Sequence, residues 1–178
     1  IYEHNISVNI SGKDISKDDF LSNLECILSN YDIPLSCLTF ELTESVLIND
    51  FQHLSNTLTL LKKMGVQVSI DDYGTGYSSL FYISQLPFTE IKIDKSFIAN
   101  IEHSEKDLTI VKTTLEMARS LNLKVVAEGI ESKAVELILR EYGCQIVQGY
   151  YYKKPTPFPE YCQWLQKEYQ KLNCYGAI

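Results

Sequence analysis

The 178-residue sequence lacks the motifs by which several large enzyme classes are recognised. It contains no G-x-G-x-x-G and no Walker sequence, which excludes dehydrogenases and NTPases that depend on them. The three histidines, His4, His53 and His103, lie at the start of the chain and on or beside expected helices. No Ser/His/Asp or Cys/His nucleophile set therefore emerges.

Paired cysteines and a surplus of positive charge are absent too. The five cysteines are odd in number and form no C-x-x-C pair, which favours free thiols in a reducing compartment over a disulfide framework or a zinc site. The formal net charge of −7 argues against binding to long nucleic acids. A small phosphodiester could still bind if metal ions supplied the positive charge.

Long apolar runs are also missing. No stretch approaches the length of a membrane span, and Ile1-Tyr2-Glu3-His4 is unlike a signal peptide. We therefore expect a cytoplasmic protein, or the cytoplasmic domain of a larger signalling protein. The length, the hydrophobic fraction of 45% and the lack of a linker predict one globular domain over residues 1–178.

Short apolar runs alternate with amphipathic helical stretches along the whole chain. Asp18 or Asp19 and Ser132 are expected to begin helices, Gly65 and Gly143 to follow helix ends, and a last helix to run from Glu160 to about Asn173. This alternation predicts a parallel sheet with right-handed crossovers. The predicted strands are Ile6–Ile10, Leu38–Leu42, Val66–Ile70, Glu90–Ile93, Lys124–Ala127 and Gln145–Val147.

Polar residues stand at or near the C-terminal ends of these strands. They are Asn9, Glu41, Asp71, Lys92, Glu128 and Gln148. Such ends converge on one mouth in a (β/α)8 TIM-like barrel, whereas only those beside a switch point meet in an open sheet. The barrel is therefore favoured. A closed barrel needs eight units and about 250 residues, so with six units we expect the chain to be N-terminally incomplete.

The segment Asp71-Asp72-Tyr73-Gly74-Thr75-Gly76 places two carboxylates at the end of a predicted strand. Where the backbone turns, both can flank one site and bind hard divalent cations such as Mg²⁺ or Mn²⁺. Two such ions about 4 Å apart can clamp a phosphoryl group and activate water. Alternatively, one Asp caps the next helix and the glycines form a turn.

Glu41, Glu44 and Asn9 are weaker candidates. Glu41 ends an apolar run, which suits a metal ligand better than a solvated side chain. Glu44 is better explained by a structural role at the start of a helix. Asn9 lies between two apolar residues, and its amide oxygen could bind a hard cation or serve a turn beside Gly12.

Lys92 and Glu128 are the candidate catalytic groups on later strands. Lys92 lies within an apolar strand and could bind an anion or orient a nucleophilic water. Glu128 is a candidate metal ligand or base, with Glu131 nearby. The alternative is an internal ion pair of Lys92 with Asp94 or Glu131.

The run Gln148-Gly149-Tyr150-Tyr151-Tyr152-Lys153-Lys154-Pro155 follows the last predicted strand. Gln148 could bond to a metal-bound water, and the tyrosines offer faces on which a purine could stack. The same tyrosines could instead pack in the core and rim.

Taken in order, these segments resemble the EAL-domain family of cyclic di-GMP phosphodiesterases from about residue 6 to residue 159. The motifs are N-x-S at Asn9-Ile10-Ser11, E-[IL]-T-E at Glu41 to Glu44, D-D-[FY]-G-T-G-Y-S-S-L at Asp71 to Leu80, L-P-x-x-x-[IL]-K-I-D-x-S-F at Leu86 to Phe97, A-E-G-[IV]-E at Ala127 to Glu131, and Q-G-Y at Gln148 to Tyr150.

The resemblance implies an EAL-type barrel with an antiparallel first strand, and hydrolysis of cyclic di-GMP to linear pGpG at a two-metal site of Mg²⁺ or Mn²⁺. It makes Asn9, Glu41, Asp71, Asp72 and Glu128 metal ligands, and Lys92 the residue that orients the attacking water. Glu131 and Gln148 match positions beside the metals and their water, and Asp94 and Tyr152 are expected near the substrate. Glu44 matches the residue that anchors the Asp72–Ser79 loop.

The E-A-L tripeptide that names the family does not occur in this sequence. Its Glu is a metal ligand in the family, so we expect it in a missing N-terminal segment. The resemblance also implies a homodimer and upstream sensory or GGDEF domains as partners. The alternative is a non-catalytic EAL-like module that binds cyclic di-GMP or a protein.

Overall fold

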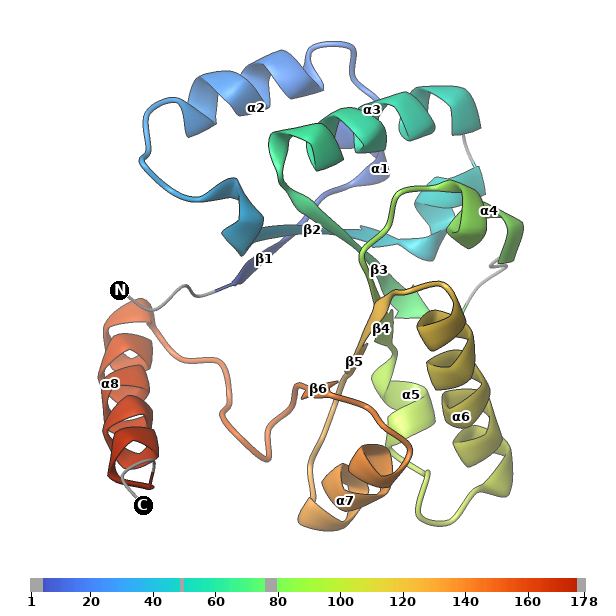
Figure 1. The fold of residues 1–178 in the computed structure, drawn as a ribbon, viewed down its shortest axis with the longest axis vertical. Helices are drawn as coiled ribbons and strands as arrows, with labels where there is room; N and C mark the ends of the chain where they lie inside the picture. Colours follow the sequence, from blue (N-terminus) through green and yellow to red (C-terminus); the bar gives the residue numbers. More distant parts are fainter. Residues whose placement is uncertain (1–4, 49, 76–79, 176–178) are drawn as a thin grey trace.

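The computed structural model describes residues 5–48, 50–75 and 80–175. Six parallel strands form one curled sheet, a half-barrel in which the strands follow one another in sequence order (Figure 1). The strands are β1 (Ile6–Asn9), β2 (Leu38–Thr43), β3 (Gln67–Tyr73), β4 (Glu90–Ile93), β5 (Lys124–Ala127) and β6 (Ile146–Val147). All six were predicted, and the parallel α/β architecture is confirmed.

The helices lie between the strands, as the alternating pattern predicts. The α-helices are α1 (Gly12–Ile15), α2 (Phe20–Leu28), α3 (Phe51–Met64), α4 (Leu80–Gln85), α5 (Lys95–Ile98), α6 (Glu105–Ser120), α7 (Lys133–Glu141) and α8 (Phe158–Tyr175). Two 3₁₀ helices, η1 (Leu35–Cys37) and η2 (Glu44–Ile48), flank β2. Each of the six strands is therefore followed by at least one helix.

Local signals in the sequence set several helix ends. Ser132 caps α7, because its hydroxyl accepts a hydrogen bond from the Val135 N–H. Gly65 ends α3 in the left-handed conformation, with φ of 97°, which only glycine adopts readily. Asp19 stands at the start of α2, but its side chain makes no capping hydrogen bond.

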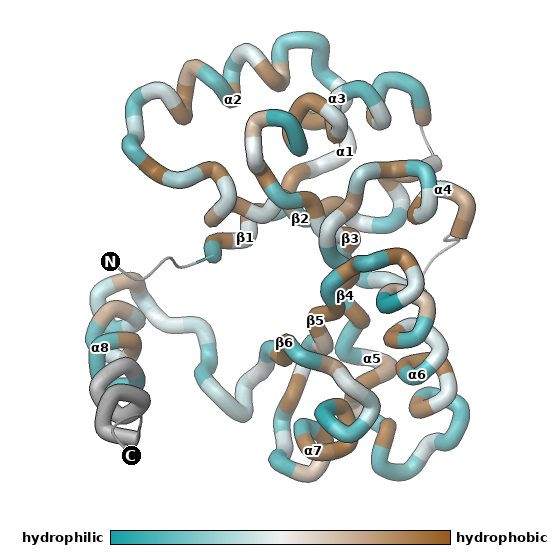
Figure 2. The backbone as a smooth tube through the Cα atoms, viewed as in Figure 1, coloured by the Kyte–Doolittle hydropathy of each residue, from teal (hydrophilic) through white to brown (hydrophobic). Residues whose placement is uncertain are grey.

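The core lies between the strands and the helices that cover the outer face of the curled sheet. Leu58 and Leu61 on α3 are fully buried, as are Ile70 on β3 and Ile91 on β4. Figure 2 shows hydrophobic residues along the strands and on the helix sides that face them, with hydrophilic residues outside. Burying side chains of this size contributes roughly 1.5–3 kcal/mol each.

The two outer strands of the sheet are β1 and β6, and each has one edge with no strand beside it in the described part of the chain. Ile6 and Val8 on β1 are 56% and 40% exposed, and Ile146 on β6 is 40% exposed. Helix α8 stands apart from the other helices (Figure 1). The antiparallel strand that the family resemblance implies is not among the six described strands.

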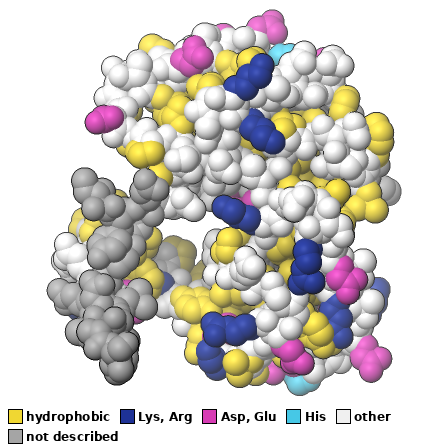
Figure 3. Space-filling model, viewed as in Figure 1, with side chains coloured by type: hydrophobic (Ala, Val, Ile, Leu, Met, Phe, Trp, Pro, Cys, Tyr) yellow, Lys and Arg dark blue, Asp and Glu magenta, His cyan; other side chains and the backbone are white. Residues whose placement is uncertain are grey.

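Figure 3 shows that the molecular face in this view is hollowed between its upper part and the region of β6 and α7 below. Among the described helices, none is long and apolar enough to cross a membrane. Cys26, Cys37, Cys144 and Cys162 are free thiols.

Candidate functional site

Lys92 on β4 lies among three acidic side chains from neighbouring strands. Its Nζ is 2.9 Å from Glu41 Oε2, 2.9 Å from Asp71 Oδ1 and 2.8 Å from Glu128 Oε1. The side chain is 6% exposed, and burial alone would lower its pKa, but the bonds to Glu128, Glu41 and Asp71 outweigh that effect and raise the pKa. The ammonium group is therefore firmly charged.

These ion pairs correct one alternative from the sequence. Lys92 was considered as a partner of Asp94 or Glu131, yet its ion pairs among the described residues are with other carboxylates. The side chain of Asp94 instead caps α5, where it accepts a hydrogen bond from the Ser96 N–H. Glu131 is exposed and lies after β5.

Asp71 and Asp72 reach the same site because of an irregularity inside β3. The predicted strand ended at Ile70, but β3 continues to Tyr73, so a regular strand would point the two carboxylates to opposite faces. The register with β4 shifts between Ile70 and Tyr73, and Asp72 has a φ of 54°. This left-handed backbone, uncommon outside glycine, turns both side chains toward one site.

The acidic cluster has the chemistry of a site for hard cations. One oxygen from each of Asp71, Asp72 and Glu128 lies within 4.8 Å of the others. Asp71 Oδ1 is buried and, apart from the Lys92 ammonium, has no hydrogen-bond partner among the described residues. Oxygen donors are the ligands that Mg²⁺, Mn²⁺ and Ca²⁺ prefer, so the residues present fit such an ion.

Burial and mutual repulsion act on two of these carboxyl groups. Burial raises the pKa of Asp72, and the negative charges of Asp71 and Asp94 raise it further. Burial also raises the pKa of Glu128, an effect that Lys92 partly offsets. Carboxylates that repel one another at a desolvated site are stabilised by any added positive charge.

Asn9 and Glu41 occupy facing positions at the ends of β1 and β2. They are register partners, and the Ile10 N–H donates to the Glu41 backbone carbonyl at 3.0 Å. Glu41 is 7% exposed, whereas Asn9 is exposed at the outer strand. Both line one cavity of about 820 Å³, so Asn9 shares a cavity with Glu41.

Glu44 anchors the segment that follows β3. Its Oε2 accepts a hydrogen bond from the Gly74 N–H at 3.3 Å, and the residue is 5% exposed. Gly74 has a φ of 97° and approaches the ring of Phe97. Residues 76–79 of the same motif lie outside the described residues. Glu44 thus makes a structural contact with the backbone of Gly74.

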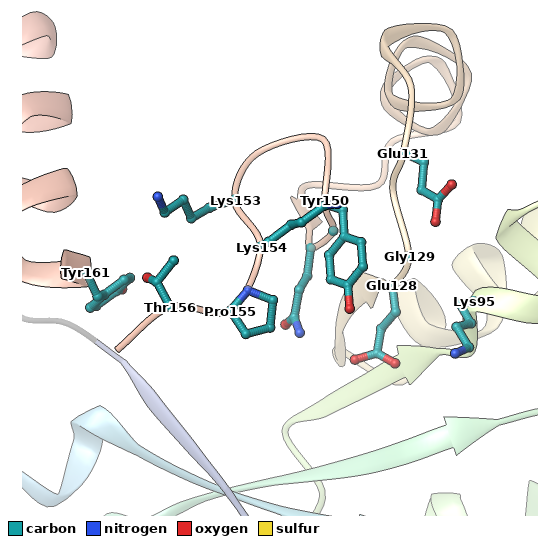
Figure 4. Close-up of a pocket in the computed structure, with 12 residues that line it drawn as sticks. Lys95, Glu128, Gly129, Glu131, Tyr150, Lys153, Lys154, Pro155, Thr156 and Tyr161 are labelled. Carbon is teal, nitrogen blue, oxygen red and sulfur yellow. The ribbon is translucent and has the colours of Figure 1, made fainter. Parts of the chain in front are cut away.

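A second cavity, of about 500 Å³, opens beside Glu128 (Figure 4). Glu131 and Gln148, which are predicted to lie beside the metals and their water, line it together with Gly149 and Tyr150. Tyr152 does not line this cavity. The pKa of Tyr152 is raised by partial burial and then by the charge of Glu136 on α7, which places its hydroxyl against that helix.

Sequence reasoning assigned no role to several residues that line this cavity. They are Lys95, Lys153, Lys154 and Tyr161. Lys154 Nζ stands 5.5 Å from the centre of the Tyr150 ring, a cation–π distance. One feature of the sequence could have indicated their role: two adjacent lysines, Lys153 and Lys154, follow the strand-end Gln148 in an otherwise acidic chain.

An α/β half-barrel with a lysine and clustered carboxylates at the C-terminal ends of its strands defines a barrel protein with a candidate cation site at its mouth. More specifically, the chain belongs to the EAL domain family, whose pattern matches residues 2–155. The resemblance read from the sequence motifs is thereby confirmed.

Comparison with individual proteins supports this family membership. The chain is 39% identical over 153 residues to the bifunctional diguanylate cyclase/cyclic di-GMP phosphodiesterase MucR of Pseudomonas aeruginosa, covering 86% of this chain and 22% of that protein. The structure titled PaMucR phosphodiesterase, c-di-GMP complex, superimposes with a TM-score of 0.83 at 38% identity, covering 88% of this chain and 63% of that one. The chain spans about a fifth of the length of the curated relatives it matches first.

Another relative was solved with a metal. BlrP1 of Klebsiella pneumoniae, in its manganese and cyclic di-GMP complex, superimposes with a TM-score of 0.80 at 26% identity. The match covers 86% of this chain and 39% of that one. A divalent cation and the cyclic dinucleotide thus occur together in a protein with this fold.

Proposed function

We propose that this chain forms the larger part of a metal-dependent phosphodiesterase that hydrolyses cyclic di-GMP to linear pGpG. The observation that carries the proposal is the position of Lys92, within 3 Å of Glu41, Asp71 and Glu128, beside the oxygen cluster of Asp71, Asp72 and Glu128. The relatives named as cyclic di-GMP phosphodiesterases support this substrate and reaction.

Asn9, Glu41, Asp71, Asp72 and Glu128 would hold the cations, with Mg²⁺ or Mn²⁺ as the expected ions. Their side chains offer only oxygen donors, which such ions prefer. Two divalent cations bound there would polarise the phosphoryl group and lower the pKa of a bound water. The burial and mutual repulsion that raise the pKa values of Asp72 and Glu128 would favour cation binding.

Lys92 would orient the attacking water. Its charged ammonium is held by bonds to Glu41, Asp71 and Glu128, which use all three of its N–H donors. It would donate to a water oxygen when one of these carboxylates turns to a cation instead. The water oxygen would form a bond to phosphorus as the bond to the ribose 3′ oxygen breaks, and a water proton would end on that leaving oxygen. Asp72 or Glu128, which share the acidic cluster, would carry this proton.

Glu131 and Gln148 would meet the substrate or its water from the cavity beside Glu128. Asp94 would act through Asp72, whose pKa it helps to raise. Tyr152 would support the cavity wall from behind through α7.

We also propose that a segment preceding residue 1 completes the barrel and supplies the Glu of an E-A-L tripeptide. The open edges of β1 and β6, with exposed Ile6 and Val8, support this. Exposed Leu80 and Phe81 on α4, close after the segment that Glu44 holds, support a homodimer. Sensory or GGDEF domains are the expected further partners.

The test is hydrolysis of cyclic di-GMP by the full-length protein, with Mn²⁺ or Mg²⁺ and with EDTA, followed by chromatography for pGpG. We expect metal-dependent formation of pGpG, lost in Asp71→Ala. Binding of cyclic di-GMP without turnover under any metal would identify a receptor module and overturn the proposed activity.

A further inference from the structure

The acidic centre lacks the positive charge needed to bind both phosphates of a doubly charged substrate. Glu41, Asp71 and Glu128 surround the Lys92 ammonium, and Asp72 and Asp94 add two more carboxylates beside Asp71. Two divalent cations together with Lys92 would balance these five charges and no more. A cyclic dinucleotide carries a second phosphate, which this centre would repel unless other cations lie close by.

Such cations line the adjoining cavity. Lys95, Lys153 and Lys154 contribute to its wall, and within the described part of the chain no carboxylate lies within ion-pairing distance of any of them. Figure 4 shows Glu128 and Lys95 on one side of the cavity and Lys153 and Tyr161 on the other. Glu131 also lines the wall, so the lysines outnumber the carboxylates there.

The loop that carries Lys153 and Lys154 is fixed to the segment that carries Glu128. The Ile130 N–H donates to the Gln148 carbonyl at 3.0 Å, and the Tyr151 N–H donates to the Ile130 carbonyl at 2.9 Å. Gly149 permits this approach, because a β-carbon there would collide with the Ile130 backbone. The backbone of this loop is therefore held beside the segment that carries Glu128.

Local geometry then limits where the lysines can go. The N–H groups of Tyr152 and Lys153 donate to the Gly149 carbonyl at 3.1 and 3.4 Å, closing a turn. Pro155 restricts Lys154 to extended backbone conformations. Lys154 also stands over the Tyr150 ring, which limits the freedom of its side chain. The backbone is thus already ordered, and ligand binding would mainly have to order the lysine side chains.

We propose that Lys153 and Lys154 form an anion subsite that binds the second, non-scissile phosphate of the cyclic dinucleotide. This inference rests on the proposed function and adds a specificity determinant to it. The subsite distinguishes substrates with two phosphodiesters from those with one, and it acts on substrate binding rather than on the reacting phosphorus.

The experiment compares two substrates in the full-length protein with Mn²⁺. Lys153→Ala/Lys154→Ala should raise KM for cyclic di-GMP by about tenfold or more with little change in kcat, as expected when charged hydrogen bonds are lost. KM for bis(p-nitrophenyl) phosphate, a diester with one phosphate, should stay near the wild-type value. Lys153→Arg/Lys154→Arg should restore cyclic di-GMP binding, since the charge remains.

Lys106→Ala is the matched control, because Lys106 is an exposed lysine on α6 that does not line the cavity. Its KM for cyclic di-GMP should not change. An unchanged KM in a well-folded double alanine variant, or an equal rise for both substrates, would overturn the subsite while leaving the phosphodiesterase intact.

A binding measurement separates the two proposals. If the wild type binds cyclic di-GMP with Ca²⁺ but never hydrolyses it, the proposed activity fails, and a tenfold weaker Kd in the double variant would still support the subsite. If the wild type neither binds nor hydrolyses cyclic di-GMP, both proposals are overturned.

Discussion

Lys92 Nζ and Glu128 Oε1 lie 2.8 Å apart, although α5 and α6 separate the two residues in the sequence. The same ammonium contacts Glu41 and Asp71, so one side chain from β4 joins β2, β3 and the end of β5. This arrangement couples the chemistry of the site to the stability of the sheet, and several predictions test that coupling.

Lys92→Met should reduce cyclic di-GMP hydrolysis by at least about 100-fold, because the oriented water and the positive charge are both lost. In EDTA it should lower the free energy of unfolding by about 3 kcal/mol, since three buried or half-buried carboxylates lose their counter-ion. Mn²⁺ should recover part of that loss. Urea unfolding with and without Mn²⁺ measures this, with Lys106→Met as the control. Equal unfolding curves for Lys92→Met and wild type would contradict the coupling.

Asp71→Asn should abolish most hydrolysis and weaken cation binding, because it removes charge from a side chain of unchanged size. The rise in Tm that Mn²⁺ produces in the wild type should shrink clearly in this variant. Thermal unfolding across a Mn²⁺ titration gives the result. Asp18→Asn, at an exposed position before α2, should keep the full rise. A wild-type Mn²⁺ response in Asp71→Asn would remove Asp71 from the set of ligands.

Glu90, which is not among the proposed metal ligands, predicts a pH effect on stability. Burial raises the pKa of Glu90, and the Ser69 hydroxyl and Lys124 offset only part of this. The folded state therefore keeps this proton to a higher pH than the unfolded chain, and the free energy of unfolding falls as pH rises through that window. Glu90→Gln should be more stable than wild type near pH 7, and the difference should close on acidification below about pH 4. A difference that is constant with pH would contradict this.

Glu44→Ala should lower hydrolysis because the Gly74 N–H loses its acceptor and the backbone after Asp72 is released. The change should appear mainly in kcat, with a modest loss of stability of about 1–3 kcal/mol from the hydrogen bond. Steady-state kinetics and urea unfolding measure the two effects. Glu25→Ala, on the exposed side of α2, is the control. Normal kcat in Glu44→Ala would show that this anchor is dispensable.

Gly149→Ala should impair the site through the backbone. An added β-carbon would collide with Ile130, whose segment carries Glu128, so both stability and kcat should fall. Gly12→Ala is a milder comparison, because the nearest atom is a methyl group of Val46 at 3.1 Å. Hydrogen exchange at Ile130 and kinetics would report the change. Similar behaviour of the two variants would contradict the close approach.

Much of the fold could be predicted from local patterns. Continuous apolar runs predict strands buried on both faces, and β4 and β5 begin and end where the sequence places them. The Ser132 cap and the Gly65 end follow from short-range chemistry. These features depend on a few neighbouring residues, which is why the sequence alone reveals them.

Four of the residues predicted for the site lie together in the structure, but their geometry was predicted only in part. Polar residues at strand ends identify Glu41, Asp71, Lys92 and Glu128, because parallel strands share one mouth. The predicted end of β3 was wrong. The strand continues past Ile70 through an irregular register with β4 and a positive φ at Asp72, which local sequence patterns do not reveal. The partners of Lys92 depend on distances across strands, which spacing does not encode.

The left-handed backbone at Asp72 places the stability of the fold and the cation-binding chemistry of the site in opposition. Glycine at position 72 would relieve the conformational cost, since only glycine adopts this φ freely, but it would delete a carboxylate from the cation cluster. Selection for stability alone would therefore favour glycine at position 72, whereas selection for catalytic turnover would retain the aspartate. Among relatives of this chain, a glycine at that position would indicate a domain that keeps the barrel fold but has lost catalytic activity.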